Sequence, residues 1–256
     1  MKRSLTPRAI TVLVLVFFYL PVFVLVLNSF NASRFGGEWT GFTLDWYRKL
    51  WHAGEIWHAL GNTLGIAAAA TVISSVLGTT AALALDRYRS RLQDTHYLLV
   101  YAPLVVPEIL MGMSLLLFFA TVGLELGVLS IFLAHVTFCV SFVAMVVLGR
   151  LQDFDDSLLE AARDLGATAW AATWRVLLPL LAPGIAAGAL LAFTLSIDDF
   201  VITFFVAGPG ATTLPIRIYS MIKHGSPPLI NALSTLLLFV TFVTVWLSQR
   251  LLEDRA

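Results

Sequence analysis

The chain alternates between long apolar segments and short polar ones. Six segments are apolar over about 20 residues or more, which is the length that an α-helix needs to cross a membrane. These segments are residues 9–30, 60–85, 97–124, 126–149, 180–207 and 229–247. The pattern predicts an all-α, polytopic membrane protein with six transmembrane helices, in which residues 1–256 form a single transmembrane domain.

The first apolar segment follows Lys2, Arg3 and Arg8, as the apolar core of a signal peptide would. The core of a signal peptide is shorter, at about 7–15 residues, and a small-residue cleavage site follows it. We therefore expect residues 9–30 to be retained as the first span.

Composition agrees with a location in the membrane. Apolar residues make up 59% of the chain and charged residues only 12%, and the mean hydropathy is +0.86. A soluble domain carries about 25% charged residues. The formal net charge is zero, which disfavours a nucleic-acid partner, because such partners select a basic surface. The single cysteine, Cys139, has no partner for an internal disulfide, and we interpret it as a packing residue.

Lysine and arginine residues indicate how the chain is oriented. If the N-terminus is cytoplasmic, eleven of the 16 Lys and Arg residues fall on the cytoplasmic side and five on the outer side. Cytoplasmic loops of membrane proteins carry an excess of these residues. We therefore expect both termini in the cytoplasm, and the loop 151–179 lies on the same side in this orientation.

The loop 151–179 has the pattern of two short helices. Ser157 and Glu160 have the spacing of a capping box, which predicts the start of the first helix. Gly166 is expected to end that helix. A second short helix is predicted to run through Trp170 and to end before Pro179.

The residues of this loop resemble the EAA loop of ABC importer permeases. The matching positions are Glu160, Ala161, Ala162, Gly166, Val176, Leu178 and Pro179. The resemblance implies the type I importer permease fold. It also implies a coupling role for Glu160, Ala161, Ala162, Gly166 and Pro179, which would dock this loop onto a cytoplasmic ATPase. An ordinary amphipathic loop helix is the alternative.

The chain contains no G-x4-G-K-[ST] motif, the P-loop that holds ATP in most ATPases. We therefore expect that it is not itself an enzyme and has no cofactor of its own. ATP and magnesium would be bound by separate ATPase subunits. Its histidines are scattered, and their spacing fits no helical metal pair.

Three carboxylates lie inside the predicted spans, and they are Glu108, Asp198 and Asp199. An ionisable residue at membrane depth costs at least about 2.5–3.5 kcal/mol, so it needs a partner or a purpose. No lysine or arginine lies in these two spans. A water-lined cavity, a neutral protonated form, a cationic substrate or a position in the headgroup zone would each explain the acids. Adjacent helical residues point about 100° apart, so Asp198 and Asp199 cannot both face one spot equally.

A second, more extensive resemblance involves the same acids. The segments 42–47, 107–109, 196–202, 208–209, 214–221 and 231–235 resemble the spermidine/putrescine permeases of ABC importers, of the PotC type. The resemblance implies an inner-membrane subunit that takes up polyamines. It implies a second related permease subunit, two cytoplasmic ATPase subunits and a periplasmic binding protein as partners. It also implies that Trp46, Glu108, Ser196, Asp198 and Asp199 take part in polyamine passage, although close relatives often have Asp at the position of Glu108.

Other interpretations remain open at the level of sequence. The chain could be an ABC permease for another small solute, or an ATP-independent cation transporter that uses the acids as its path. Trp46 could be an anchor at the membrane–water boundary without a substrate role. His135 is interpreted as a histidine whose hydrogen bonds are satisfied within the helix bundle.

Overall fold

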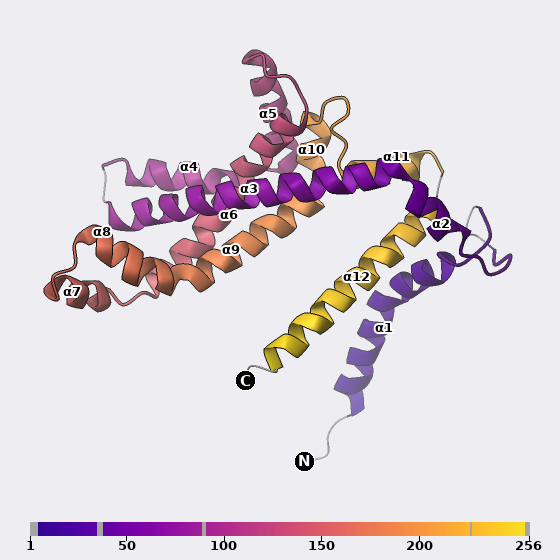
Figure 1. Cartoon of the computed structure of the whole chain (residues 1–256), viewed down its shortest axis with the longest axis horizontal. Helices are drawn as coiled ribbons and strands as arrows, with labels where there is room; N and C mark the ends of the chain where they lie inside the picture. Colours follow the sequence, from indigo (N-terminus) through magenta and orange to yellow (C-terminus); the bar gives the residue numbers. More distant parts are fainter. Residues whose placement is uncertain (1–4, 35–37, 89–90, 226, 254–256) are drawn as a thin grey trace. The chain divides into compact units, whose positions relative to one another are not determined.

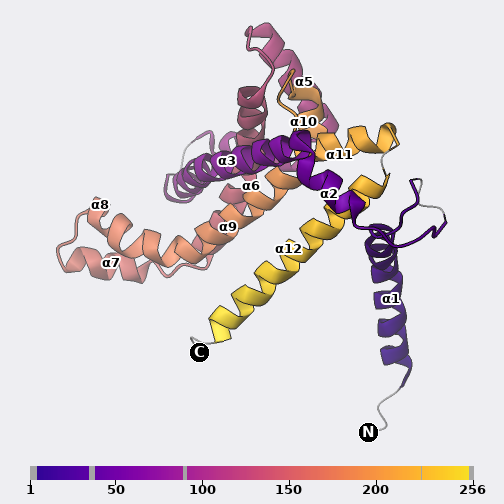
Figure 2. The same cartoon turned by 45° about the vertical axis from the view of Figure 1, so that its right-hand side comes forward.

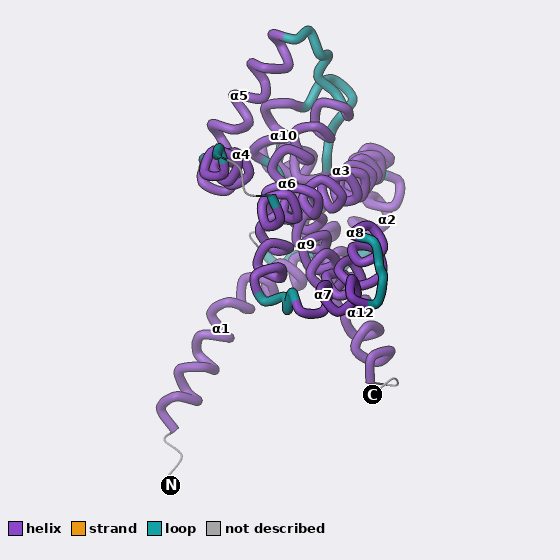
Figure 3. Tube along the Cα trace, turned by 90° about the vertical axis from the view of Figure 1, so that its left-hand side faces the viewer, coloured by secondary structure: helices purple, strands orange, loops and turns teal. Residues whose placement is uncertain are grey.

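The computed structural model describes residues 5–34, 38–88, 91–225 and 227–253, and their regular secondary structure is helical (Figure 3). The one exception is an isolated antiparallel bridge between Asn31 and Phe42. The chain divides into two compact units. The terminal unit consists of residues 1–57 and 217–256, and the central unit consists of residues 58–216. The all-α prediction is confirmed.

The terminal unit contains α1 (Leu5–Asn28), α2 (Asp45–His52) and α12 (Pro227–Glu253). Helix α12 packs against both α1 and α2 (Figure 1). Helices α3 (Gly54–Arg87) and α11 (Leu214–Lys223) each cross the boundary between the units. Asn31 holds the segment before α2, because its side chain accepts hydrogen bonds from the backbone N–H groups of Ser33 and Thr40.

The remaining helices belong to the central unit. They are α4 (Gln93–Val105), α5 (Glu108–Thr121), α6 (Val128–Gln152), α7 (Ser157–Asp164), α8 (Ala169–Ala172), the π-helical turn η1 (Thr173–Leu177), α9 (Leu178–Asp198) and α10 (Val201–Val206). Helix α6 is the most buried of the candidate spans, and it packs against α4, α9 and α10. Helix α3 also approaches α6 closely, because a Cβ atom on Gly78 would lie 2.7 Å from Cβ of Val143. Small residues at such crossings allow membrane helices to pack backbone to backbone.

Within the described residues, five helical segments are long and apolar enough to cross a membrane, and the bent pair α4–α5 brings the number to six if it counts as one span. The predicted continuous span 97–124 is corrected by this pair, whose two helices meet at 110°. Pro107 causes the break, since proline lacks an N–H group and forces the preceding residue into an extended conformation. Val106 accordingly has φ −70° and ψ 129°.

The predicted fifth span, residues 180–207, also differs from the structure at both ends. Helical structure begins earlier, because α8, η1 and α9 follow one another without a break from residue 169 to 198 (Figure 2). The predicted end of a short helix before Pro179 is therefore wrong. At the other end α9 stops at Asp198, and the separate helix α10 begins at Val201.

The predicted capping box of Ser157 and Glu160 is wrong as well. Helix α7 has Asp156 at its N-cap position, with no hydrogen bond from that side chain. The Asp155 carboxylate instead accepts a hydrogen bond from the backbone N–H of Ser157 at 3.0 Å. Hydrogen bonds from Ser157 lower the pKa of the Asp155 carboxyl.

Candidate functional site

Two helix breaks in the central unit border one cavity of about 260 Å³. The break between α4 and α5 contributes Glu108, and the break between α9 and α10 contributes Asp198 and Asp199. The other walls are largely apolar or aromatic, and they include Met111, Phe138, Phe142, Phe200 and Ile202. The structure therefore brings together three carboxylates that come from segments far apart in the sequence.

Asp198 and Glu108 are the exposed acids of this cavity. Glu108 is the first residue of α5, where the positive end of the helix dipole favours a carboxylate. Asp198 is the last residue of α9. Neither carboxylate has a hydrogen-bond or ion-pair partner among the residues that the structure describes. Both are available to a cationic group that enters the cavity.

Asp199 has the opposite environment, since its side chain is only 6% exposed. One carboxylate oxygen, Oδ2, accepts hydrogen bonds from the backbone N–H of Thr203 at 2.8 Å and from its hydroxyl at 2.5 Å. The other, Oδ1, accepts a hydrogen bond from the backbone N–H of Ile202 at 3.3 Å. These are unpaired N–H groups of the first turn of α10, so Asp199 caps that helix.

His135 of α6 lies behind Asp199, and its side chain is 2% exposed. Its Nδ1 atom lies 2.7 Å from Oγ of Ser196, and its Nε2 atom lies 2.9 Å from Oγ1 of Thr203. The same Nε2 atom lies 3.3 Å from Oδ2 of Asp199. The interpretation of His135 as a satisfied bundle histidine is thus confirmed. Ser196 is buried and contacts His135. This link between a candidate site residue and the histidine had no signal in the sequence beyond a polar residue within an apolar span.

Trp46 belongs to the terminal unit, on α2, and not to the cavity of the central unit. Its indole N–H donates to the carbonyl oxygen of Asn31 at 2.8 Å. The ammonium of Lys49 lies 4.3 Å from the ring centroid, which is a cation–π distance. A pocket of about 480 Å³ next to Trp46 is also lined by the basic side chains of Arg34, Lys49 and His224.

The EAA residues lie on α7 and on the turn and helices that follow it. Glu160, Ala161, Gly166 and Pro179 are exposed, and Ala162 is half-buried. Gly166 has φ +89°, a conformation that side-chain-bearing residues rarely adopt. The predicted turn at Gly166 is thus confirmed.

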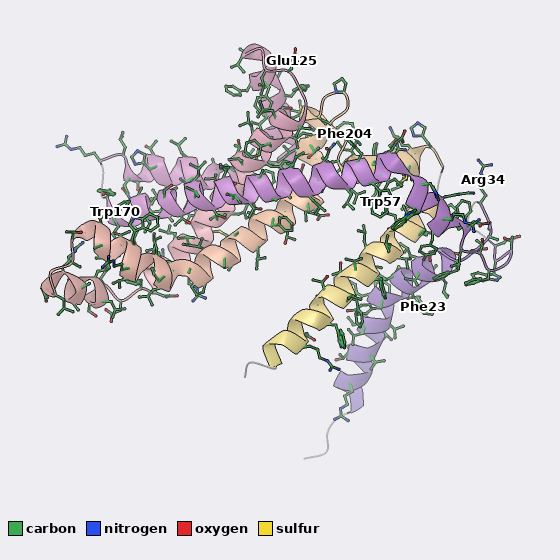
Figure 4. The ribbon with its side chains drawn as sticks, in the orientation of Figure 1. Phe23, Arg34, Trp57, Glu125, Trp170 and Phe204 are labelled. Atoms are coloured by element: carbon green, nitrogen blue, oxygen red, sulfur yellow. The ribbon has the colours of Figure 1, made fainter. Side chains whose placement is uncertain are left out.

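Large apolar side chains are exposed around this turn. Trp170, labelled in Figure 4, is 71% exposed, and Leu165 is 90% exposed. The ring centroids of Trp170 and Trp174 lie 5.3 Å apart. Exposed apolar surface of this kind marks sites of contact with another protein or with a membrane. An ion pair of 2.8 Å between Arg87 and Asp156 connects the end of α3 to the start of the loop.

No three or more His, Cys, Asp or Glu side chains lie together so as to hold a metal ion in the part of the chain that the structure describes. The acids that converge on the cavity are two exposed groups and one capped group. Their arrangement suits reversible binding of an organic cation, with aromatic walls for its apolar part.

Comparison with known proteins assigns the chain to a family. The family described as "Binding-protein-dependent transport system inner membrane component" matches residues 74–255. Spermidine/putrescine transport system permease protein PotC of Escherichia coli (strain K12) is 41% identical over 239 residues, which cover 93% of this chain and 90% of that protein. Putrescine transport system permease protein PotI of the same organism is 42% identical over 263 residues, which cover 98% and 94% respectively.

A solved structure shares the fold. It is the crystal structure of a bacterial ABC transporter involved in the import of the acidic polysaccharide alginate, with a TM-score of 0.74, 16% identity and 98% coverage of both chains. The type I importer permease fold implied by the EAA motif is thereby confirmed. The chain therefore belongs to the family of inner-membrane components of binding-protein-dependent transport systems, and it is a permease subunit of an ABC importer.

Proposed function

We propose that this permease takes up polyamines, and that the cavity between the two helix breaks is part of their path. The observation that carries the proposal is the pair of exposed carboxylates, Glu108 and Asp198, in a cavity with apolar and aromatic walls. The relatives PotC and PotI, both about two-fifths identical to this chain, are named for spermidine and putrescine or for putrescine alone.

The chemistry of a polyamine suits this cavity. A polyamine is a flexible alkyl chain that carries two or more ammonium groups. Its ammonium groups can pair with Asp198 and Glu108, and its methylene groups can pack against rings such as Phe138 and Phe142. The unpaired state of both acids favours entry of a cation, because opposite charges attract one another at short range.

The proposed partners follow from what an ABC importer requires. They are a second related permease subunit, two cytoplasmic ATPase subunits and a periplasmic binding protein. In this proposal the ATPase subunits bind ATP and magnesium, and this chain holds no cofactor. The loop with Glu160, Ala161, Ala162, Gly166 and Pro179 would dock onto an ATPase subunit and transmit its closure to the spans as alternating access. The exposed Leu165 and Trp170 support such docking.

We further propose that both termini are cytoplasmic. The excess of Lys and Arg on the side of the termini and of the loop 151–179 supports this orientation. It also puts the docking loop on the side where ATP is available.

Transport by the purified complete transporter in proteoliposomes tests the proposal. Radiolabelled spermidine or putrescine and the binding protein are supplied on one side, and ATP on the other. Accumulation that needs ATP supports the proposal. Accumulation that persists with an inactivated ATPase would favour an ATP-independent cation transporter. ATPase activity that responds to another loaded binding protein, with no polyamine accumulation, would indicate a permease for another small solute.

A further inference from the structure

Two adjacent acids that line the same cavity differ in what surrounds them. Asp198 is exposed and has no partner among the described residues, whereas Asp199 is buried and bonded to Thr203, Ile202 and His135. Most of the hydrogen-bonding capacity of the Asp199 carboxylate is thus used within the protein, in particular at Oδ2. The two acids therefore cannot serve the substrate in the same way.

We propose that His135 is a positioning residue that holds Asp199 as the cap of α10 and thereby sets the place of Asp198 in the cavity. The inference rests on the proposed function only where it refers to a polyamine. Asp199 then acts through the fold, and Asp198 is the acid that meets the substrate. Ser196 is assigned to the same positioning group, because its hydroxyl orients the His135 ring.

The hydrogen bonds determine where the proton on the His135 ring lies. The hydroxyl of Thr203 has one hydrogen, and it is donated to Oδ2 of Asp199 at 2.5 Å. The contact of 2.9 Å between Oγ1 of Thr203 and Nε2 of His135 therefore requires Nε2 to carry the hydrogen. The Nε2–H group is thus directed at Thr203 and Asp199 together, which lie on the same side of the ring.

The backbone conformation at Asp199 explains why the Nε2–H group of His135 matters for the cavity. The backbone leaves the helical conformation at Asp199, which has φ −63° and ψ 122°. The break at this residue leaves Asp198 at the end of α9, beside the cavity. Helix α10 has only six residues, too few to be stable alone, so its start depends on the cap. Loss of the His135 contact would let Asp199 turn and shift Asp198 with it.

Two amide substitutions distinguish the contact made by Nδ1 of His135 from the contacts made by its Nε2 atom. The side-chain amide of glutamine in His135→Gln can place its nitrogen where Nε2 lies, and can still donate to Asp199. Asparagine in His135→Asn is shorter and reaches only the place of Nδ1, beside Ser196. Thr137→Val on the same helix is a matched control, because the Thr137 hydroxyl is exposed and bonds only the carbonyl oxygen of Leu133.

Hydrogen exchange of the complete transporter in detergent or nanodiscs gives a readout that does not depend on the substrate. We expect His135→Asn to speed exchange of the Ile202 and Thr203 backbone N–H groups by about tenfold or more, the effect of losing a hydrogen bond to a charged group. His135→Gln and Thr137→Val are expected to leave this exchange close to that of the unaltered protein. Equal loss of protection in the Gln and Asn variants would overturn the proposal in favour of simple packing by the ring.

Uptake kinetics test the link to the cavity. We expect His135→Asn to raise the KM for spermidine about tenfold, with maximal rate and membrane abundance changed far less, and His135→Gln to restore the KM. Combining His135→Asn with Asp199→Asn should be no worse than Asp199→Asn alone, because both act through one cap. Additive losses would contradict the proposal. If the unaltered transporter moves no polyamine, the proposed function fails, while the exchange experiment still decides the role of His135.

Discussion

Glu108 and Asp198 line the same cavity although they come from different helices, and each stands at a place where a helix is interrupted. Glu108 begins α5 directly after Pro107, and Asp198 ends α9 directly before the extended residue Asp199. Interrupted helices are a recurrent way to expose polar groups at membrane depth, because the freed backbone lies in protein or against a cavity. The two breaks thus produce the site.

Neutralising the cavity acids should weaken polyamine binding. We expect Asp198→Asn to raise the KM for spermidine about tenfold or more, because the substitution removes the negative charge that pairs with an ammonium group of the substrate. Glu108→Gln should act in the same direction, and Glu108→Asp should retain most activity because the charge remains. Uptake at matched protein abundance is the measurement. Normal KM in both neutral variants would place the acids outside the path and favour the headgroup interpretation.

Gly166 should be essential for coupling and dispensable for insertion into the membrane. Its φ of +89° cannot be adopted by proline, whose ring holds φ near about −65°. We expect Gly166→Pro to reach the membrane in normal amounts but to lose uptake that is driven by ATP hydrolysis. ATPase activity and uptake are measured on the same sample. Gly149→Ala on α6 is the control, because a Cβ there meets nothing within 4 Å; unchanged coupling in the Gly166 variant would argue against the docking role.

Thr203→Val should destabilise the helix break. The substitution keeps the shape of the side chain but removes a hydroxyl that donates to the buried carboxylate of Asp199. A hydrogen bond to a charged group contributes about 1.5–3 kcal/mol, so we expect a lower thermal unfolding temperature of the purified transporter. Thr203→Ser, which retains the hydroxyl, should behave like the unaltered protein. A Val variant as stable as the Ser variant would show that the cap contributes little.

The role of Trp46 can be tested with substitutions that retain or remove its aromatic ring. Trp46→Phe keeps an aromatic face but loses the hydrogen bond to the carbonyl oxygen of Asn31, and Trp46→Leu loses both. If the ring meets a substrate cation during transport, the Phe variant should keep most uptake and the Leu variant should lose it. Equal losses, accompanied by lower membrane abundance, would instead identify Trp46 as an anchor of the terminal unit.

The sequence predicted the spans well and their interruptions poorly. Hydropathy reports whether a segment is apolar, and it does not distinguish one helix from two helices with a break. The hydropathy pattern predicted one continuous span over residues 97–124, although Pro107 is a residue type that interrupts helices, and the structure has a 110° break there. The break at Asp199 depends on a cap formed by its own side chain and on His135, which lies in a different span. A contact between residues that are so far apart in the chain cannot be predicted from the hydropathy or local motifs of a single sequence.

The loop 151–179 shows the same division. The turn at Gly166 followed from a local rule about glycine, and the structure confirms it. In a capping box the Glu160 side chain would accept a hydrogen bond from the backbone N–H of Ser157. The prediction failed because the neighbouring Asp155 carboxylate accepts that hydrogen bond instead. The continuous run from α8 to α9 was missed because proline favours the first turn of a helix, so Pro179 predicted the start of a new one. In the structure Pro179 lies inside the run, just after the π-helical turn η1.

The polyamine assignment can be tested by uptake of radiolabelled spermidine and putrescine into cells with and without this subunit. The proposed partners are present in both strains, and other polyamine uptake systems are removed. We expect that uptake depends on this subunit and disappears when the partner ATPase is inactivated. Equal uptake of both polyamines in the two strains would contradict the polyamine assignment, and the chain would remain an ABC permease for a different solute.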